Sequence, residues 1–260
     1  MTKSASFPLL KHPAFGGISQ AAISNLKSSC KVLRFELGGQ LCDPNDIPAR
    51  ILVILQGQAR LVGRHNGCLT TVGKFGPGSV IGAASLLCGA PCENVIAAQE
   101  VIACGLSDEL WRDLYSREAS FRHWCDQQLW PQELLKLLEA LEQNTPETDS
   151  SALAKLEGAL QSAKRCFPDQ ASVDAALDAG KLLYVTSAWG DLTVGQRVRS
   201  SADLPLCEPF ALRLVALPAA AGADAADNKQ SIRADAPVPG ASIQDAEVLP
   251  PVSSFSPERN

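Results

Sequence analysis

The stretch that decides the fold of this chain reads GAASLLCGAPCEN and runs from Gly82 to Asn94. A rigid loop, Phe75–Gly78, leads into it, because its proline fixes φ while the flanking glycines allow the chain to reverse. The residues of the stretch are mostly small and apolar, and two of them are glycines. Strand-like sequence lies on both sides, so we expect it to connect two parts of a β-structure.

Short β-strands are predicted around this stretch. Apolar runs at Ile51–Leu55, Ala59–Val62 and Cys68–Val72 are separated by turn-forming residues. An earlier strand is expected at Lys31–Leu37, and Val95–Leu106 supplies two more. Strands at roughly ten-residue intervals are typical of an all-β sandwich or jelly roll. We therefore expect about eight strands between residues 30 and 106.

Helices are predicted on both flanks of the strands. Ile18–Ser28 has apolar residues at helical spacing, and Ser107 is a suitable N-cap for a helix that follows the last strand. Further helices are expected at Ser120–Gln128 and at Pro131–Gln143, where the proline suits a first helical position. Strands and helices together predict a first domain over residues 1–144.

A second unit is predicted after the polar linker at residues 144–151. Ala152–Arg165 has a helical pattern, and strand-like pieces follow at Lys181–Thr186, Asp191–Val198 and Ala211–Leu217. We expect a small α+β module over residues 150–218. Residues 219–260 are rich in Ala, Asp, Pro and Ser, which predicts a disordered linker.

Composition excludes several classes of protein. A net charge of -5 does not suit a surface that neutralises nucleic-acid phosphates, so no nucleic-acid partner is expected. No run of about 20 apolar residues is present to cross a bilayer, and the amino terminus lacks signal-peptide features. These observations predict a cytoplasmic location.

Catalytic and metal sites are not predicted. The nine cysteines are odd in number and scattered, which is typical of reduced thiols, and His12, His65 and His123 are too far apart in sequence to suggest a clustered metal site. No serine elbow, P-loop or dinucleotide fingerprint occurs in the chain. We expect a protein that is not an enzyme and that has no cofactor.

The decisive stretch resembles the phosphate-binding cassette of cyclic-nucleotide-binding domains. That cassette reads Gly-Glu-Leu-Ala-Leu-Leu, three residues, then Pro-Arg-Ala-Ala, and residues 82–94 match it in length without a gap. Family-like pieces precede it in the right order at Phe15–Ser19, Phe35–Gly39, Leu55–Gly57 and Phe75–Gly78. The resemblance covers most of residues 7–117 and implies an α+β protein whose β-roll is of the cyclic-nucleotide-binding type with flanking helices.

The chain departs from that cassette at the side chains that grip the ligand. In the family, backbone N–H groups at a helix start and one Arg hold the cyclic phosphate, and a Glu binds the ribose. Here Ala83 stands in place of the Glu and Cys92 in place of the Arg, and Glu93 adds a carboxylate. Loss of a buried ionic partner costs about 2–5 kcal/mol, so we expect weak cyclic-nucleotide binding. The candidate ligand-binding residues of this degenerate cassette are Gly82, Ala83, Ala84, Ser85, Pro91 and Cys92.

The whole layout resembles the amino-terminal region of cyanobacterial peptidase-containing ABC exporters of the bacteriocin or lantibiotic type. The pieces Tyr184–Ser187 and Leu212–Pro218, ahead of a Pro-rich linker, point there. The resemblance implies a non-catalytic regulatory or docking region in peptide export. Its partners would be the peptidase and membrane domains of the exporter, and its location the inner membrane.

Two other functions stay open at this point. One is a ligand sensor that binds a cyclic nucleotide or another small anion through backbone contacts alone. The other is a transcription regulator of the same fold, although residues 150–218 show no pair of basic helices for DNA binding. A homodimer through the helices at Ser120–Gln143 is a further hypothesis.

Overall fold

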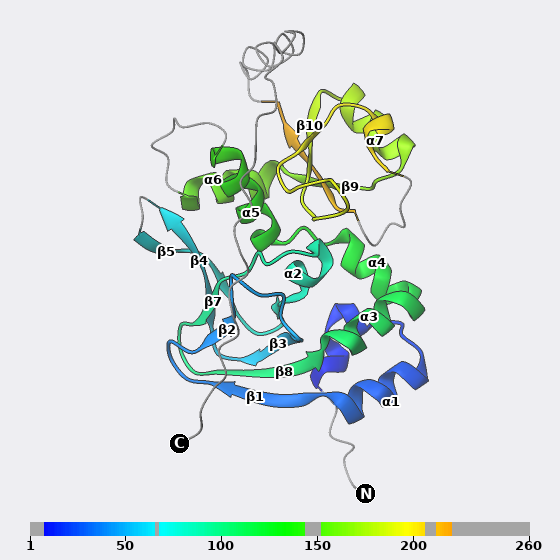
Figure 1. Ribbon diagram of the computed structural model, residues 1–260. Coiled ribbons are helices and arrows are strands. Elements are labelled where there is room, and N and C mark those ends of the chain that lie inside the picture. The colour runs from blue at the N-terminus through cyan, green and yellow to red at the C-terminus, as the bar shows by residue number, and fades with distance from the viewer. Residues whose placement is uncertain (1–7, 66–67, 144–151, 206–211, 220–260) are drawn as a thin grey trace, which may run out of the picture. The chain divides into compact units, whose positions relative to one another are not determined.

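The structure is a computed structural model that describes residues 8–65, 68–143, 152–205 and 212–219. All of them belong to one compact unit, Met1–Ala219 (Figure 1). The predicted linker at 144–151 lies outside the described residues, as does the predicted disordered tail from residue 220 onward. The division into domains 1–144 and 150–218 stays a prediction.

Eight antiparallel strands form the roll in the described residues between 31 and 107. They make two four-stranded sheets with the orders β1-β8-β3-β6 and β2-β7-β4-β5 (Figure 1). The strands are β1 (Lys31–Phe35), β2 (Gln40–Cys42), β3 (Arg50–Gln56), β4 (Ala59–His65), β5 (Cys68–Phe75), β6 (Val80–Ile81), β7 (Val95–Ala97) and β8 (Val101–Ser107). The predicted fold class, a β-roll with flanking helices in an α+β protein, is confirmed.

The turn between β3 and β4 shows why a glycine is needed there. Gly57 has a φ of 94°, in the left-handed region that L side chains rarely adopt. A Cβ atom on Gly57 would lie 2.0 Å from the carbonyl oxygen of Glu100. The turn expected at residues 56–58 therefore depends on glycine for both its backbone conformation and its space.

Helices cover the ends of the roll. Ser107 caps α3 by accepting a hydrogen bond from the Leu110 N–H at 3.2 Å, as predicted. Trp111 of α3 and Phe121 of α4 are fully buried and meet edge to face, with ring centroids 4.8 Å apart. The helices are η1 (Pro8–Lys11), η2 (Pro13–Phe15), α1 (Gln20–Ser29), α2 (Ala83–Cys88), α3 (Asp108–Arg117), α4 (Ala119–Gln127), α5 (Pro131–Gln143) and α6 (Ala152–Ser162).

A third four-stranded sheet follows α6, and we call residues 164–218 the second module. Its four strands are antiparallel in the order β11-β10-β12-β9, and α7 packs on β10. The small α+β architecture agrees with the expected one. The elements are β9 (Lys164–Cys166), α7 (Gln170–Asp178), β10 (Lys181–Val185), β11 (Arg197–Val198), η3 (Ser201–Asp203) and β12 (Leu214–Pro218).

Several predicted boundaries in the second module are wrong. The helix expected at Ala152–Arg165 ends at Ser162, and residues 164–166 form a strand instead. The strand expected at Asp191–Val198 is reduced to its last two residues, because Gly195 adopts a φ of 89° and turns the chain. Helix α7 was not predicted, since its Ala-rich sequence carries few large apolar residues to mark a face.

The roll and the second module share a hydrophobic core. Leu134 and Leu137 of α5 are fully buried in one cluster with residues of both sheets of the roll. The same cluster contains Ala159 and Ala163 from α6 and its C-terminal end, and Val215 from β12. Burial of this apolar surface ties the second module to the roll.

One expectation about the cysteines is wrong. Cys30 and Cys104 form a disulfide, with their Cα atoms 6.1 Å apart. The pairing of β1 with β8 brings them together, because Val32 lies opposite Cys104 and Cys30 is two residues before Val32 on the same side of the ladder. The two cysteines are 74 residues apart in the sequence, so their spacing does not indicate that they are neighbours. The other cysteines in the described residues are free thiols.

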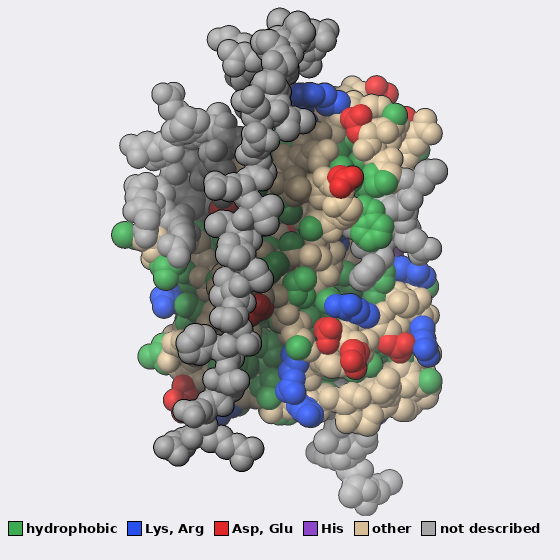
Figure 2. Space-filling model, viewed as in Figure 1, with side chains coloured by type: hydrophobic (Ala, Val, Ile, Leu, Met, Phe, Trp, Pro, Cys, Tyr) green, Lys and Arg blue, Asp and Glu red, His purple; other side chains and the backbone are tan. Residues whose placement is uncertain are grey.

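The surface of the described part carries both signs of charge. On the face shown in Figure 2, basic and acidic side chains are interspersed and do not gather into one basic patch. The expected absence of a nucleic-acid partner stays a prediction. Within the described ranges, the helices are too short or too polar to span a bilayer.

Candidate functional site

The cassette residues form the start and body of α2. Gly82 precedes the helix with a φ of 93°, and a Cβ atom there would lie 2.9 Å from the Pro48 side chain. Ala83, Ala84 and Ser85 make the first turn of the helix and are fully buried. The start of α2 therefore needs glycine at residue 82, and the side chains of its first turn lie inside the core.

The backbone donors at the start of α2 are occupied by a carboxylate of the same chain. Glu93 is fully buried, and its Oε2 accepts a hydrogen bond from the Gly82 N–H at 2.6 Å. Its Oε1 accepts from the Ala84 N–H at 2.9 Å and from the Ser85 N–H at 3.2 Å. An anion at a helix start is favoured by these donors and by the helix dipole. Glu93 thus fills the position that the sequence resemblance assigns to a phosphate.

The surroundings of Glu93 raise the pKa of its carboxyl group. Burial raises the pKa of the Glu93 carboxyl to about 7, and the bonds from the backbone N–H groups of residues 82, 85 and 84 offset part of this effect. The buried Gln132 side chain of α5 also lowers the pKa of Glu93. The cassette and α5 therefore meet around this carboxylate.

Cys92 turns its polar groups toward α2. Its N–H donates to the Ser85 Oγ at 3.1 Å, and its Sγ lies 3.5 Å from the same oxygen. The neighbouring Cys88 thiol and burial raise the pKa of Cys92 well above its usual value. Where the family has a guanidinium for the phosphate, this chain has a neutral thiol.

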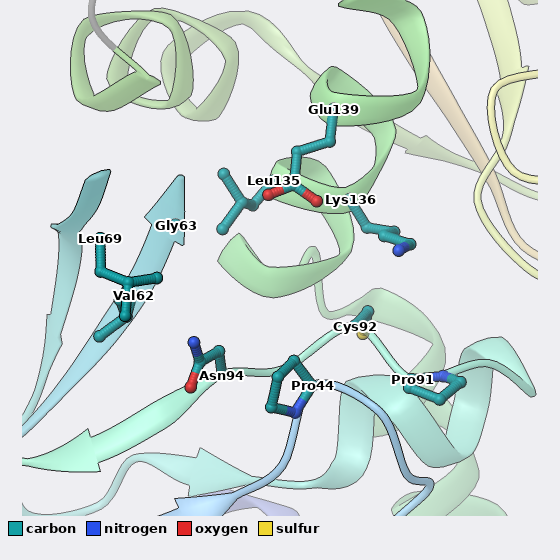
Figure 3. Close-up of a pocket in the computed structure, with 10 residues that line it drawn as sticks. All are labelled: Pro44, Val62, Gly63, Leu69, Pro91, Cys92, Asn94, Leu135, Lys136 and Glu139. Carbon is teal, nitrogen blue, oxygen red and sulfur yellow. The ribbon is translucent and has the colours of Figure 1, made fainter. Parts of the chain in front are cut away.

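A cavity of about 480 Å³ lies beside the cassette. Figure 3 shows residues of the loop after α2, of the β4–β5 hairpin and of α5 around it. The walls combine apolar and polar groups, with the Lys136 and Glu139 side chains on the helix side. Its lining residues are Pro44, Val62, Gly63, Leu69, Pro91, Cys92, Asn94, Leu135, Lys136 and Glu139.

The structure brings the predicted site residues together, with one addition. Gly82, Ala84 and Ser85 direct their N–H groups at one point, while Pro91 and Cys92 line the cavity. Ala83 contributes only a buried methyl group. The roles of Glu93 as an internal acceptor and of Gln132 beside it were not predicted, because the sequence placed Glu93 near a phosphate but not in its position.

No metal-binding cluster of three or more His, Cys, Asp or Glu side chains occurs among the residues that the structure describes. His12 caps η2 and bonds to the Gly78 carbonyl, far along the chain from the cassette cysteines. The candidate site is therefore one of backbone donors, a carboxylate and a cavity.

The chain is similar to several solved structures. No protein-family model matches it, and no curated protein matches it. Similar solved structures include the regulatory subunit of a cAMP-independent protein kinase A from Trypanosoma brucei, with 21% identity and a TM-score of 0.37. That similarity covers 45% of this chain and 47% of the kinase subunit, so the chain spans about half of its length.

Two further solved structures are similar to the chain. A putative cyclic nucleotide-binding protein from Geobacter metallireducens is 16% identical, with a TM-score of 0.38 over 44% of this chain and 84% of its own. A cAMP-binding acyltransferase from Mycobacterium smegmatis is 22% identical, with a TM-score of 0.38 over 50% of this chain and 40% of its own.

Proposed function

We propose that the chain is a non-catalytic regulatory or docking module whose cassette does not grip cyclic nucleotides. One observation carries the proposal: the Glu93 carboxylate accepts the N–H groups of Gly82, Ala84 and Ser85. A phosphate would have to displace this carboxylate, and it would find no cationic side chain at Cys92. In this proposal the module acts by offering a surface of constant shape to a protein partner.

The expected affinity follows from the missing partner. An absent charged partner costs about 2–5 kcal/mol, which is roughly 30-fold to several-thousand-fold in affinity. Displacement of Glu93 adds to this penalty. We expect no dissociation constant below about 100 μM for cyclic AMP or cyclic GMP.

The partner we propose is the peptidase and membrane part of a peptide-exporting ABC transporter. The sequence pieces behind this proposal lie mostly inside the second module, where Thr186, Ser187 and Arg213 are buried. A partner would therefore contact the exposed surface around them, such as Trp189, which is 41% exposed. Co-purification with the peptidase domain of such an exporter, compared between the wild type and Trp189→Ala, tests the association.

Calorimetric titration with cyclic AMP and cyclic GMP tests the proposed function. The wild type should show no binding in the micromolar range. The variant Ala83→Glu, Cys92→Arg, Glu93→Ala restores the family's side chains, and Ala83→Gln, Cys92→Met, Glu93→Ala is the matched control, with side chains of similar size but without the two charges. Thermal unfolding checks that the restored variant is folded. Binding by this variant supports a cassette that lacks only the side chains that bind the ligand.

A ligand sensor is the second candidate, and the cavity of about 480 Å³ beside Pro91 and Cys92 favours it. In this function a small ligand enters the cavity and reaches backbone donors after Glu93 moves away. Micromolar binding of a cyclic nucleotide by the wild type would support the sensor and overturn the non-binding module.

A further inference from the structure

Helix α2 is held at both ends by other parts of the chain. Glu93 accepts the N–H groups at its start. At its other end, the carbonyl oxygen of Cys88 accepts a hydrogen bond from the Ala188 N–H at 2.8 Å. Ala188 belongs to the second module, more than 90 residues further along the chain.

The turn that carries Ala188 is itself anchored on α5. Thr186 is buried and donates its hydroxyl hydrogen to Glu133 of α5. Ser187 is buried as well, and its Oγ accepts the Arg213 N–H at 2.9 Å. The two residues before Ala188 are therefore held in place, Thr186 by α5 and Ser187 by Arg213.

A buried ion pair fixes α5 to the second module. The Arg213 Nη2 lies 2.8 Å from the Glu133 Oε2, and its Nε donates to Oε1 at 3.1 Å. Arg213 also donates to the Gln128 carbonyl at 2.9 Å, and the Arg165 Nη1 lies 3.8 Å from Glu133. Burial alone would raise the pKa of Glu133, but the charges of Arg213 and Arg165 outweigh it and lower the pKa.

The same helix forms one wall of the cavity. Leu135 and Lys136 line the cavity within one turn of Glu133, while Gln132 lies beside Glu93. Further along α5, Ala140 packs against Gly195 of the second module, where an added Cβ atom would lie 3.0 Å away. Helix α5 thus connects the second module to the cassette.

The geometry points to a built-in clamp: the second module holds α2 and α5 in one arrangement around the cassette. This inference deepens the proposed non-binding function and rests on it. A chain with this clamp presents the same surface at all times. The arrangement of α2 and α5 changes only when the second module separates from them.

Hydrogen–deuterium exchange of the full chain tests the clamp. Ala188→Pro removes the N–H that reaches Cys88, whereas Ala188→Ser keeps it and is the matched control; Ala188 is exposed, so neither change fills the core. The proline variant should raise exchange at least 10-fold at the amides of residues 86–90 and in the first turns of α5. Exchange in β3 and β8 should stay as in the wild type.

A second pair of variants covers the case in which the proline variant does not fold. Arg213→Met combined with Glu133→Gln removes both charges of the buried pair, and Arg122→Met on the exposed face of α4 is the control. The double variant should loosen the same two segments. Faster exchange confined to residues 185–198 and 212–218, or an equal rise over the whole roll, would overturn the clamp.

The two proposals fail in different experiments. Micromolar binding of cyclic AMP by the wild type would overturn the proposed function without any exchange measurement. Unchanged exchange at residues 86–90 in a folded Ala188→Pro variant would overturn the clamp even if the wild type binds no nucleotide.

Discussion

Among single residues, Glu93 does most to define the cassette. Replacement by Gln keeps its size but places an amide NH₂ opposite one of the backbone donors, so at least one N–H loses its acceptor in a buried place. An unsatisfied buried group costs about 1–3 kcal/mol. We expect Glu93→Gln to lower the free energy of unfolding by this amount in urea titrations, and Glu36→Gln at an exposed position to change it by less than about 0.5 kcal/mol.

The titration of Glu93 gives a second test at the same residue. Burial raises its pKa from 4.5 to about 7, so between these values the folded protein binds a proton that the unfolded chain has lost. The contribution of Glu93 to stability therefore decreases as pH rises from 4.5 to 7, with a slope of up to about 1.4 kcal/mol per pH unit. Unfolding of the wild type and of Glu93→Gln at several pH values measures it as a difference.

His12 also titrates in this pH range, but its contribution to the free energy of unfolding is the same in the wild type and in Glu93→Gln. Burial lowers the pKa of His12, which makes the protein less stable as pH falls below about 6.5, the opposite trend. His12 is common to both proteins and cancels. A difference that is flat with pH, or that grows with pH, would contradict the raised pKa of Glu93.

The sequence predicted part of this site. The remaining contacts could not be predicted because they depend on the tertiary packing of the chain. Ala83 and Cys92 could be recognised as departures because the cassette has fixed spacing. The hydrogen bonds of Glu93 could not, because they depend on how closely the loop before β7 passes the start of α2. The position of Gln132 near that carboxylate depends in the same way on the packing of α5.

At the scale of elements, Gly57 of the β3–β4 turn can be compared with Gly76 of the loop after β5. Gly57→Ala should destabilise the protein by about 1–3 kcal/mol or more, because φ is 94° and the added Cβ would meet the Glu100 carbonyl at 2.0 Å. Gly76→Ala is the control, since nothing lies within 4 Å of its added Cβ and its φ is not positive. Thermal unfolding measures both, and equal midpoints would contradict the steric argument.

Elements were predicted well where sequence periodicity was strong. Helix α5 was placed correctly at both ends, because Pro131 marks its start and leucines mark one face. Strand β3 is a continuous apolar run and was placed to within a residue or so. In the second module, α7 and β9 are short and rich in small or charged residues, so their structure comes from packing that periodicity does not show.

At the scale of the whole molecule, the shared core predicts that the first domain is not stable without the second module. A chain that ends at residue 143 would expose the core that Ala159 and Val215 cover, and would leave Glu133 buried without Arg213. Loss of one partner of a buried pair typically costs about 3–5 kcal/mol. We expect this truncated chain to melt lower than residues 1–219 and to bind a hydrophobic dye. Equal melting without dye binding would favour two independent domains.

The carboxylate at the start of α2 belongs to the same chain as the donors that it meets. It therefore behaves as a tethered ligand, whose effective concentration is fixed by geometry at the millimolar level or above. Dilution does not reduce its occupancy, and a messenger at micromolar levels competes poorly with it. A protein built in this way would report nothing about the abundance of a nucleotide. It would respond to an event that acts on the chain itself, such as the arrival of a partner or the release of the second module.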